Sequence, residues 1–448
     1  RQYIAYCFHD VSSYQKFGSY TGDGTTTKSI TTGFKVDFVL IKISSGSDQW
    51  VILDSKRGGT KYLQPNLSAA EGTESGVDID FTSTGFTLTG SGGGIGQVNS
   101  NGSTYIYWAV AKNIPINSTL ANSFKVVAYT GNGGTQSITG TGFKPDLVWA
   151  KKRSGADDNA WFDSVRGVQK EILSNSTAAE ATKTGAISSF DEDGFTTGAN
   201  GALNANSSTY IAWCFKAGNT WQANEDGTIR SIVNVNTANG FSIIEYEGNN
   251  TAGATIGHGL TSAPEMVIVK QLDITEHWTT GHSYLNGGTN PWDYVVWLNR
   301  NVEQENQDWP WNDTAPSSSV ITLGSGGGIN NNGGKFIAYA FHSVSGYSKI
   351  GGYTGSGNNN NAVSLGFQPD FVMIKRTNDS GGWLIFDSVR SSSNPRNDRI
   401  EANNNQAEQT NSGDKWLNFN STNFEANGSD SELNQSGGTY IYMAFKMN

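Results

Sequence analysis

The chain has 448 residues, a formal net charge of −10 and only 16% charged residues, while aromatic residues make up 11%. The acidic balance argues against a nucleic-acid-binding protein, which needs a basic face. The sequence contains no run of about 18 apolar residues, so it predicts no membrane-spanning helix. Glycine is abundant (55) and proline scarce (9). Together with short apolar runs, this turn-rich composition predicts a folded, β-rich chain and not a disordered one.

One stretch recurs four times along the chain. Its fullest form, at 366–375, is Gly-Phe-Gln-Pro-Asp followed by an apolar run and a lysine, and copies lie at 33–42, 142–151 and, more weakly, 263–270. Glycine tolerates positive φ and proline lacks an N–H, so the motif marks the entry to a strand. The unbroken apolar run predicts a strand covered on both faces. The closing lysine is expected to return the chain to water.

A Tyr-Thr-Gly landmark, which is Tyr-Glu-Gly in the third copy, sets the length of the repeat. It begins at Tyr20, Tyr129, Tyr246 and Tyr353, a spacing of about 110 residues, which is too long for a solenoid turn. Short strands, frequent turns and the lack of helical periodicity predict an antiparallel β-sandwich. The expected fold class is therefore all-β: a tandem array of four antiparallel β-sandwich domains, arranged as beads on a string.

The expected boundaries follow from the same alignment. Residues 1–16 match the end of the third repeat, so we expect them to be the last strand of a preceding repeat plus a joint, in a fragment of a longer chain. Repeats 1 to 4 then span 17–115, 116–220, 221–345 and 346–448. Repeat 3 diverges most, because it lacks the Phe-Asp-Ser-X-Arg sequence, has 297–300 in that place and holds five tryptophans.

An aspartate followed three residues later by an arginine recurs in three repeats. These pairs are Asp54 and Arg57, Asp163 and Arg166, and Asp387 and Arg390. With a tryptophan on the same strand face, each could form a sugar platform, but repetition in three copies favours a structural hydrogen-bonded pair at a strand end. Glu71, Glu180 and Glu408 recur as well. They could pair with the aspartates as a glycosidase acid and base, and a turn contact is the favoured interpretation.

The divergent repeat carries the candidate ligand-binding residues. Trp292, Trp309 and Trp311 lie in stretches rich in Asn, Asp, Gly and Pro, with Asp293 and Asn312 beside them. An indole ring on a polar loop suits the C–H face of a sugar, while neighbouring amides and carboxylates bond its hydroxyls. The alternative is that these rings form a small loop core or a contact between repeats.

Cysteine and histidine positions argue against redox or metal chemistry. Cys7 and Cys214 align with alanines in the other copies of the closing motif, so each is expected in a small buried slot and not in a disulfide. His258, His277 and His282 lack the spacing of a metal-ligand set. No metal site and no cofactor is predicted, although the acidic loop at 191–194 leaves calcium open as an alternative.

Several motifs carry a resemblance to a known family. They are Tyr-X-Lys-X-Gly-X-Tyr-Thr-Gly at 14–22 and 347–355, Gly-Phe-X-Pro-Asp-Phe-Val-X-Ile-Lys, Phe-Asp-Ser-Val-Arg, and the closing Gly-Gly-Thr-Tyr-Ile-Tyr-Met-Ala-Phe at 437–445. Together they resemble a repeat module of bacteriophage tail-fibre and other virion appendage proteins, such as those of phages of marine bacteria and cyanobacteria. The resemblance covers nearly the whole chain. It implies a lectin-like, concanavalin-type jelly-roll array displayed on a virion, with no catalytic residues.

The expected function is therefore a non-enzymatic structural or adhesin component of a virion appendage, such as a tail fibre. Its loops would bind a host cell-surface glycan or receptor outside the cell. Its other expected partners are further virion proteins and copies of itself, with a trimer as one option, and neither nucleic acid nor membrane is expected. Two alternatives stay open: a polysaccharide depolymerase, and a bacterial cell-surface adhesin or scaffold of the same repeat type.

Overall fold

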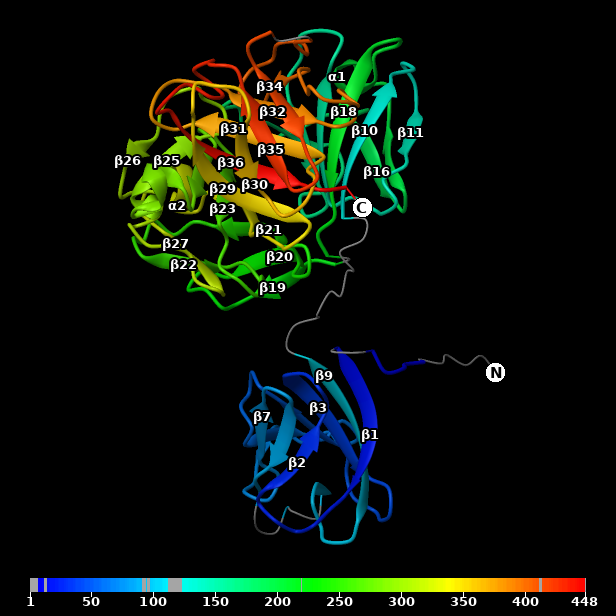
Figure 1. Cartoon of the computed structure of the whole chain (residues 1–448). Coiled ribbons are helices and arrows are strands. Elements are labelled where there is room, and N and C mark those ends of the chain that lie inside the picture. The colour runs from blue at the N-terminus through cyan, green and yellow to red at the C-terminus, as the bar shows by residue number, and fades with distance from the viewer. Residues whose placement is uncertain are drawn as a thin grey trace. The chain divides into compact units, whose positions relative to one another are not determined.

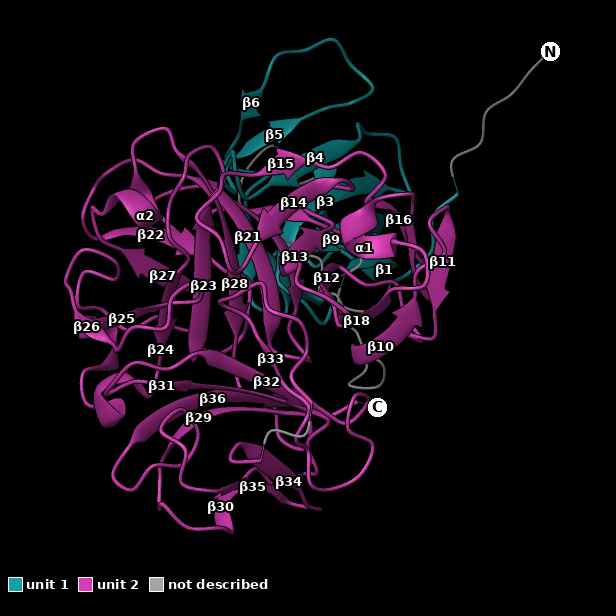
Figure 2. Cartoon of the chain, turned by 90° about the horizontal axis from the view of Figure 1, so that it is seen from above, with its two compact units in different colours: residues 1–115 teal, residues 116–448 magenta. Residues whose placement is uncertain are grey.

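A computed structural model describes residues 7–11, 14–90, 94, 97–111, 123–218, 220–410 and 413–447 (Figure 1). Almost all of its regular structure is antiparallel strand, which confirms the all-β expectation. The chain divides into two compact units, Arg1–Pro115 and Ile116–Asn448, coloured separately in Figure 2. Repeat 1 lies in unit 1, and repeats 2, 3 and 4 make up unit 2.

Repeat 1 has two antiparallel sheets with a hydrophobic core formed by both. The larger sheet has the order β1-β9-β3-β4-β5-β6 and the smaller the order β2-β8-β7; Val39, Ile41 and Phe86 are among the core residues. The strands are β1 (Gln15–Thr21), β2 (Lys28–Thr31), β3 (Val36–Ile43), β4 (Val51–Asp54), β5 (Lys61–Leu63), β6 (Gly72–Thr73), β7 (Ile79–Thr82), β8 (Gly85–Leu88) and β9 (Thr104–Ala111).

Repeat 2 has the same plan. Its sheets have the orders β10-β18-β12-β13-β14-β15 and β11-β17-β16, and Val148, Phe162 and Phe195 lie in the core that both contribute to. The elements are β10 (Phe124–Thr130), β11 (Gln136–Thr139), β12 (Leu147–Lys152), β13 (Ala160–Asp163), β14 (Lys170–Leu173), β15 (Ala181–Thr182), β16 (Ile187–Asp191), β17 (Gly194–Thr197), α1 (Gly201–Asn204) and β18 (Thr209–Phe215).

Repeat 3 extends the larger sheet by a hairpin at one edge. The orders are β19-β20-β21-β28-β23-β24-β25-β26 and β22-β27. The elements are β19 (Gln222–Asn224), β20 (Ser231–Asn236), β21 (Phe241–Glu247), β22 (Ala254–Gly257), β23 (Met266–Gln271), β24 (Thr279–His282), the 3-10 helices η2 (Leu285–Gly288) and η3 (Pro291–Asp293), β25 (Tyr294–Trp297), β26 (Glu305–Asn306), β27 (Val320–Leu323), α2 (Gly327–Asn330) and β28 (Lys335–Phe341).

Repeat 4 returns to the plan of repeat 2. Its sheets have the orders β29-β36-β31-β32-β33 and β30-β35-β34, and its core includes Val372, Phe386 and Phe424. The strands are β29 (Ser348–Thr354), β30 (Asn361–Ser364), β31 (Phe371–Arg376), β32 (Trp383–Asp387), β33 (Ile400–Glu401), β34 (Trp416–Phe419), β35 (Asn423–Asn427) and β36 (Thr439–Phe445).

A further hydrophobic core joins repeats 2, 3 and 4. Along the strands of each larger sheet, side chains point alternately into the repeat's own core and into this shared core. Figure 2 shows the three sheets arranged around it. At its centre, the equivalent phenylalanines Phe215, Phe341 and Phe445 lie with ring centroids 5.3–6.1 Å apart. These three repeats are therefore one compact unit and not the independent beads that the sequence predicted.

One set of side-chain hydrogen bonds runs in one direction around this shared core. In each repeat, the strand that follows the Gly-Phe strand begins with a side chain that donates a hydrogen bond to a backbone carbonyl of the neighbouring repeat. The donor and acceptor repeats are 3 and 2, 2 and 4, and 4 and 3. The pairs are Trp278 Nε1 to Leu173 O (2.8 Å), Asn159 Nδ2 to Glu401 O (3.2 Å) and Trp383 Nε1 to Trp297 O (2.9 Å). Repeats 2, 3 and 4 therefore form a closed ring with approximate threefold symmetry.

The lysine that ends each Gly-Phe copy does not return to water in unit 2, contrary to the sequence expectation. Lys151, Lys270 and Lys375 are at most 1% exposed. The ammonium of Lys151 donates to Asn405 O of repeat 4 (3.1 Å), and that of Lys270 donates to Thr177 O of repeat 2 (3.3 Å). The amphipathic pattern could not show this, because Asn405 and Thr177 belong to another repeat than the lysines that they bind.

The register of repeat 3 also differs from the sequence alignment. β24 pairs with β23 so that His282 lies opposite Met266, as Asp163 lies opposite Leu147 in repeat 2. His282 and Leu285 thus take the places of the aspartate and arginine, and 297–300 belongs to the next strand and its turn. An insertion containing η2 and η3 separates β24 from β25, and this insertion displaced the alignment.

Two remaining expectations concern the ends and the membrane. Most of the expected closing strand of a preceding repeat, residues 1–6, lies outside the described residues. Among the residues that the structure describes, no helix is long and apolar enough to cross a membrane.

Candidate functional site

The aromatic loops of repeat 3 do not form an exposed platform. Trp292 and Trp311 are 4% and 0% exposed and pack edge to face with their ring centroids 5.2 Å apart, inside the core of repeat 3. Trp309 packs against the same core. Asp293 lies half-buried in η3, and Asn312 lies exposed with φ of 51°. These rings therefore form a loop core, which is the alternative that the sequence left open.

The recurrent aspartates and arginines form ion pairs, each joined by the recurrent glutamate. The Arg166 guanidinium lies 2.5 Å from Asp163 Oδ2 and 3.2 Å from Glu180 Oε2. Arg390 lies 2.5 Å from Asp387 and 3.4 Å from Glu408, and Arg57 pairs with Asp54 and Glu71 at 2.6 and 3.8 Å. Because the arginine pairs with both carboxylates in each set, these groups are arranged as structural clamps.

An open pocket of about 580 Å³ lies where repeat 2 meets the β19–β20 hairpin of repeat 3. Trp221, immediately before β19, lies at this pocket with its ring 61% exposed. The other lining residues come from the Gly-Phe turn of repeat 2, from the β16–β17 turn, from the ends of β13 and β18, and from β20. They include Lys144, Asp146, Glu192, Lys216 and Asn234. An exposed indole therefore borders a polar cavity. The sequence analysis expected this combination of features in the loops that carry Trp292, Trp309 and Trp311.

The polar floor of the pocket is a hydrogen-bonded group around Asp146. Its carboxylate accepts from Ser164 Oγ (2.7 Å), Asn234 Nδ2 (2.8 Å) and the backbone N–H of Ala217 (2.9 Å). Burial raises the pKa of Asp146 to about 6, although these hydrogen bonds lower it in part. The aspartate–serine pair recurs in repeat 4 as Ser388 on Asp370 (2.7 Å), so this part of the floor is scaffold.

Asn234 is what distinguishes this pocket from its counterparts. It comes from repeat 3 and is 1% exposed, and its Nδ2 also lies 2.9 Å from Ser164 Oγ. Its Oδ1 is buried and has no hydrogen-bond partner among the described residues. A buried acceptor without a partner carries a desolvation penalty that a ligand hydroxyl or N–H can relieve. The pocket therefore combines an apolar ring face with an unsatisfied acceptor and two lysines at its rim.

A second polar cleft, of about 590 Å³, lies between repeats 3 and 4. Its lining consists mainly of amides, carboxylates and one arginine: Asn299, Arg300, Asn301, Glu401, Asn403, Asn404, Gln406 and Glu432. Burial, and then the charge of Glu432, raise the pKa of Glu401. Burial opposes ionisation of Glu432, but hydrogen bonds from Lys415 and from the Gly382 N–H lower its pKa overall. The cleft thus holds two carboxyl groups with opposed pKa shifts.

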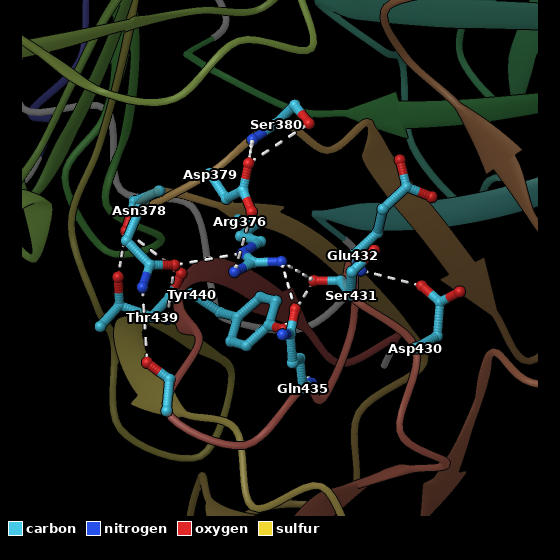
Figure 3. Close-up of polar contacts among 12 residues, drawn as sticks. Arg376, Asn378, Asp379, Ser380, Asp430, Ser431, Glu432, Gln435, Thr439 and Tyr440 are labelled. Carbon is cyan, nitrogen blue, oxygen red and sulfur yellow. Dashed lines mark hydrogen bonds and ion pairs between the residues drawn. The ribbon is translucent and has the colours of Figure 1, made fainter.

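Figure 3 shows how the wall of this second cleft is held. The Arg376 guanidinium donates to Ser431 O (3.1 Å), Gln435 Oε1 (2.7 Å) and Asn378 Oδ1 (3.1 Å). These bonds tie the turn that carries Glu432 to the end of β31. A Cβ at Gly382 would lie 2.7 Å from Glu401 Oε2, so any larger residue there would displace the Glu401 carboxylate.

Neither pocket was found from the sequence. The available signal for the first is the long polar stretch at 217–240 between repeats 2 and 3, which contains the β19–β20 hairpin. The two cysteines are both free, and Cys214 is buried whereas Cys7 is exposed. The described residues contain no group of His, Cys, Asp or Glu that could hold a metal. In the 191–194 loop, Asp193 accepts the Gly142 N–H (2.6 Å).

Comparison with known proteins identifies a family. A family model with the description "Domain of unknown function (DUF7483)" matches residues 1–114 and 120–448. No curated protein and no solved structure matches the chain.

Proposed function

The chain belongs to the DUF7483 family, and for this member we propose a non-enzymatic, carbohydrate-binding and structural role in an extracellular virion appendage such as a tail fibre. The repeats supply a lectin-like, jelly-roll scaffold, and the pocket at Trp221 contacts a host cell-surface glycan. The motifs shared with virion appendage repeats support the location, and the geometry of the pocket supports the ligand class.

One observation carries the choice of ligand. Trp221 exposes 61% of its surface beside a cavity whose buried Asn234 Oδ1 has no partner among the described residues. A sugar ring can stack its C–H face on the indole and place a hydroxyl at that oxygen, so both features are used by the same molecule. An apolar ligand would leave the amide oxygen unsatisfied.

Replacing the indole is the direct test. Trp221→Ala should weaken binding to the host polysaccharide about tenfold or more, since about 1.4 kcal/mol corresponds to a factor of ten. Tyr284→Ala removes another exposed aromatic ring (43% exposed) and should leave binding unchanged. Glycan-array and whole-cell binding experiments measure both variants. Equal binding by wild type and Trp221→Ala would sink the proposed site, and the absence of any binding by the wild type would leave a purely architectural role.

The second cleft supports one alternative, a polysaccharide depolymerase. Two carboxyl groups with pKa values shifted in opposite directions are the arrangement that acid and base catalysis requires, and Glu401 and Glu432 have it. Release of reducing sugar from host capsule by the wild type, lost in Glu401→Gln, would establish this activity. No release by the wild type would leave the binding role alone.

A cell-surface adhesin of the same repeat type shares the binding chemistry and differs in location.

A further inference from the structure

Unit 1 has the face that the repeats of unit 2 bury in their ring, and in unit 1 this face is uncovered. Ile106 in β9 is 43% exposed, whereas its counterparts Ile211, Ile337 and Ile441 are at most 1% exposed. Trp50 is 36% exposed, whereas Trp278 and Trp383, at the same place in repeats 3 and 4, are at most 1% exposed. Phe8, 57% exposed, adds to this apolar surface, with its ring 5.0 Å from that of Trp108.

The strand registers establish that these residues are equivalent. In repeat 1, Phe38, Leu40 and Lys42 of β3 lie opposite Val110, Trp108 and Ile106 of β9. In repeat 4, Phe371, Met373 and Lys375 of β31 lie opposite Phe445, Met443 and Ile441 of β36. The same positions in repeats 2 and 3 are filled by apolar side chains and the same lysine. Repeat 1 therefore carries the complete apolar face of a ring member.

The loop that accepts a neighbour's donor is also preformed in unit 1. In each ring member an asparagine side chain accepts the N–H at the start of the strand after the Gly-Phe motif, and a tight turn follows. Trp50 N to Asn66 Oδ1 (3.1 Å) repeats Trp278 N to Asn299 Oδ1 (3.0 Å). The turn bond from Leu67 N to Gln64 O (3.0 Å) repeats that from Ser176 N to Leu173 O (3.1 Å).

Backbone contacts in the ring are equally regular. Glu180 N donates to Leu272 O (2.7 Å), Glu408 N to Arg153 O (3.1 Å) and Gln304 N to Thr377 O (2.9 Å), one contact at each of the three junctions. Counting from the recurrent lysine and glutamate, the counterparts in repeat 1 are Ser44 and Glu71. At each junction this backbone bond runs opposite to the side-chain bond, so each repeat has two different sides, and three such repeats close a ring without a free side.

We propose that three copies of this chain associate through unit 1 and form the ring that repeats 2, 3 and 4 form within unit 2. In this ring, Trp50 Nε1 of one copy donates to Gln64 O of the next, and Glu71 N of one copy lies against Ser44 O of another. The occupant of the exposed face is a second copy for the following reason. The apolar face and the acceptor loop are the two different surfaces of one heterologous contact between repeats. In unit 2, three repeats joined by this contact close into a ring. Rings of this type are held by apolar burial at their centre.

The association state of the 448-residue protein tests the proposal. Light scattering behind size exclusion, and sedimentation, should give three times the chain mass, and Ile106→Lys should reduce it to that of one chain. Ile274→Lys is a matched control, because Ile274 is also 43% exposed but lies in a loop of unit 2. Circular dichroism of both variants checks that the fold is retained. A monomeric wild type would overturn the proposal.

Cross-linking tests the geometry independently of stability. In a Cys7→Ser background, Ser44→Cys together with Glu71→Cys should oxidise to a covalent species that ends at three chains on a non-reducing gel. β4 and β5 lie between β3 and β6 in the sheet, so these two positions are too far apart to join within one chain. Each single-cysteine variant should stay uncross-linked across this junction. A trimer by mass that gives no trimeric product would contradict the proposed contact.

Discussion

At the scale of single residues, the buried aspartate–arginine clamp sets the stability of repeat 4. Asp387 accepts from Arg390 Nε (2.5 Å) and from Trp213 Nε1 of repeat 2 (3.2 Å). Asp387→Asn removes the nearer of the two carboxylates that pair with the buried Arg390 guanidinium and leaves only Glu408 at 3.4 Å. We expect a loss of about 3 kcal/mol in the free energy of unfolding. Denaturant titration of unit 2 measures this.

The divergent repeat supplies the control for that prediction. Repeat 3 holds the same fold with His282 and Leu285 at the equivalent positions. Replacing both partners, in Asp387→His with Arg390→Leu, removes the stranded charge and should recover part of the loss. A double variant less stable than Asp387→Asn would contradict this account.

The buried lysines predict a pH dependence. Burial lowers the pKa of Lys375 from 10.5 to about 7, and that of Lys151 and Lys270 to about 8. Between these values and 10.5 the unfolded chain holds more protons than the folded chain, so the stability of unit 2 should rise with pH through this window. Lys375→Met should flatten the rise from pH 7 upward in unfolding titrations. The exposed Lys335→Met is the control, and an unchanged slope in Lys375→Met would refute the assignment.

At the scale of elements, the closing strands β18, β28 and β36 couple the three repeats of unit 2. Their phenylalanines meet at the centre of the ring, so Phe341→Ala should cost about 3–5 kcal/mol as a large-to-small core change. Because the cavity faces all three repeats, we expect amide hydrogen exchange to accelerate in β18 and β36 as well as in β28. Acceleration confined to repeat 3 would show that the repeats open separately.

The element scale also shows where sequence reasoning succeeds. The Gly-Phe motif predicts a strand buried on both faces, and β23 and β31 are buried along their whole length. That pattern is local. It cannot specify whether the second face is covered by the repeat's own chain or by another repeat, and so the ring and the burial of Lys375 were missed.

The same limit applies to the candidate site. The sequence identified the residue types that suit a sugar but selected Trp292 and Trp311, whose polar neighbours in sequence do not prevent burial. Trp221 lies in the long joint before β19, where nothing in the local pattern indicates exposure. Its partners Asp146 and Asn234 come from two different repeats, and only the tertiary arrangement brings them together.

At the scale of the whole molecule, the two units place one repeated face in two environments. Within unit 2 three copies of this face cover one another, and in unit 1 by itself no second copy covers it. The proposed glycan pocket lies at a junction of repeats in unit 2, so a trimer through unit 1 would present three such pockets. Linked sites of this kind gain avidity without any new contact.

The order of contacts around unit 2 also bears on biosynthesis. Repeat 2 contacts repeat 4 directly, although all of repeat 3 separates them in the chain. While a ribosome is still making repeat 4, the first two members of the ring hold their apolar faces open to solvent. They remain exposed until β36, the strand that carries the third central phenylalanine, has emerged. Nascent chains stalled before Phe445 should therefore bind chaperones that recognise apolar surface, and chains stalled beyond it should be released.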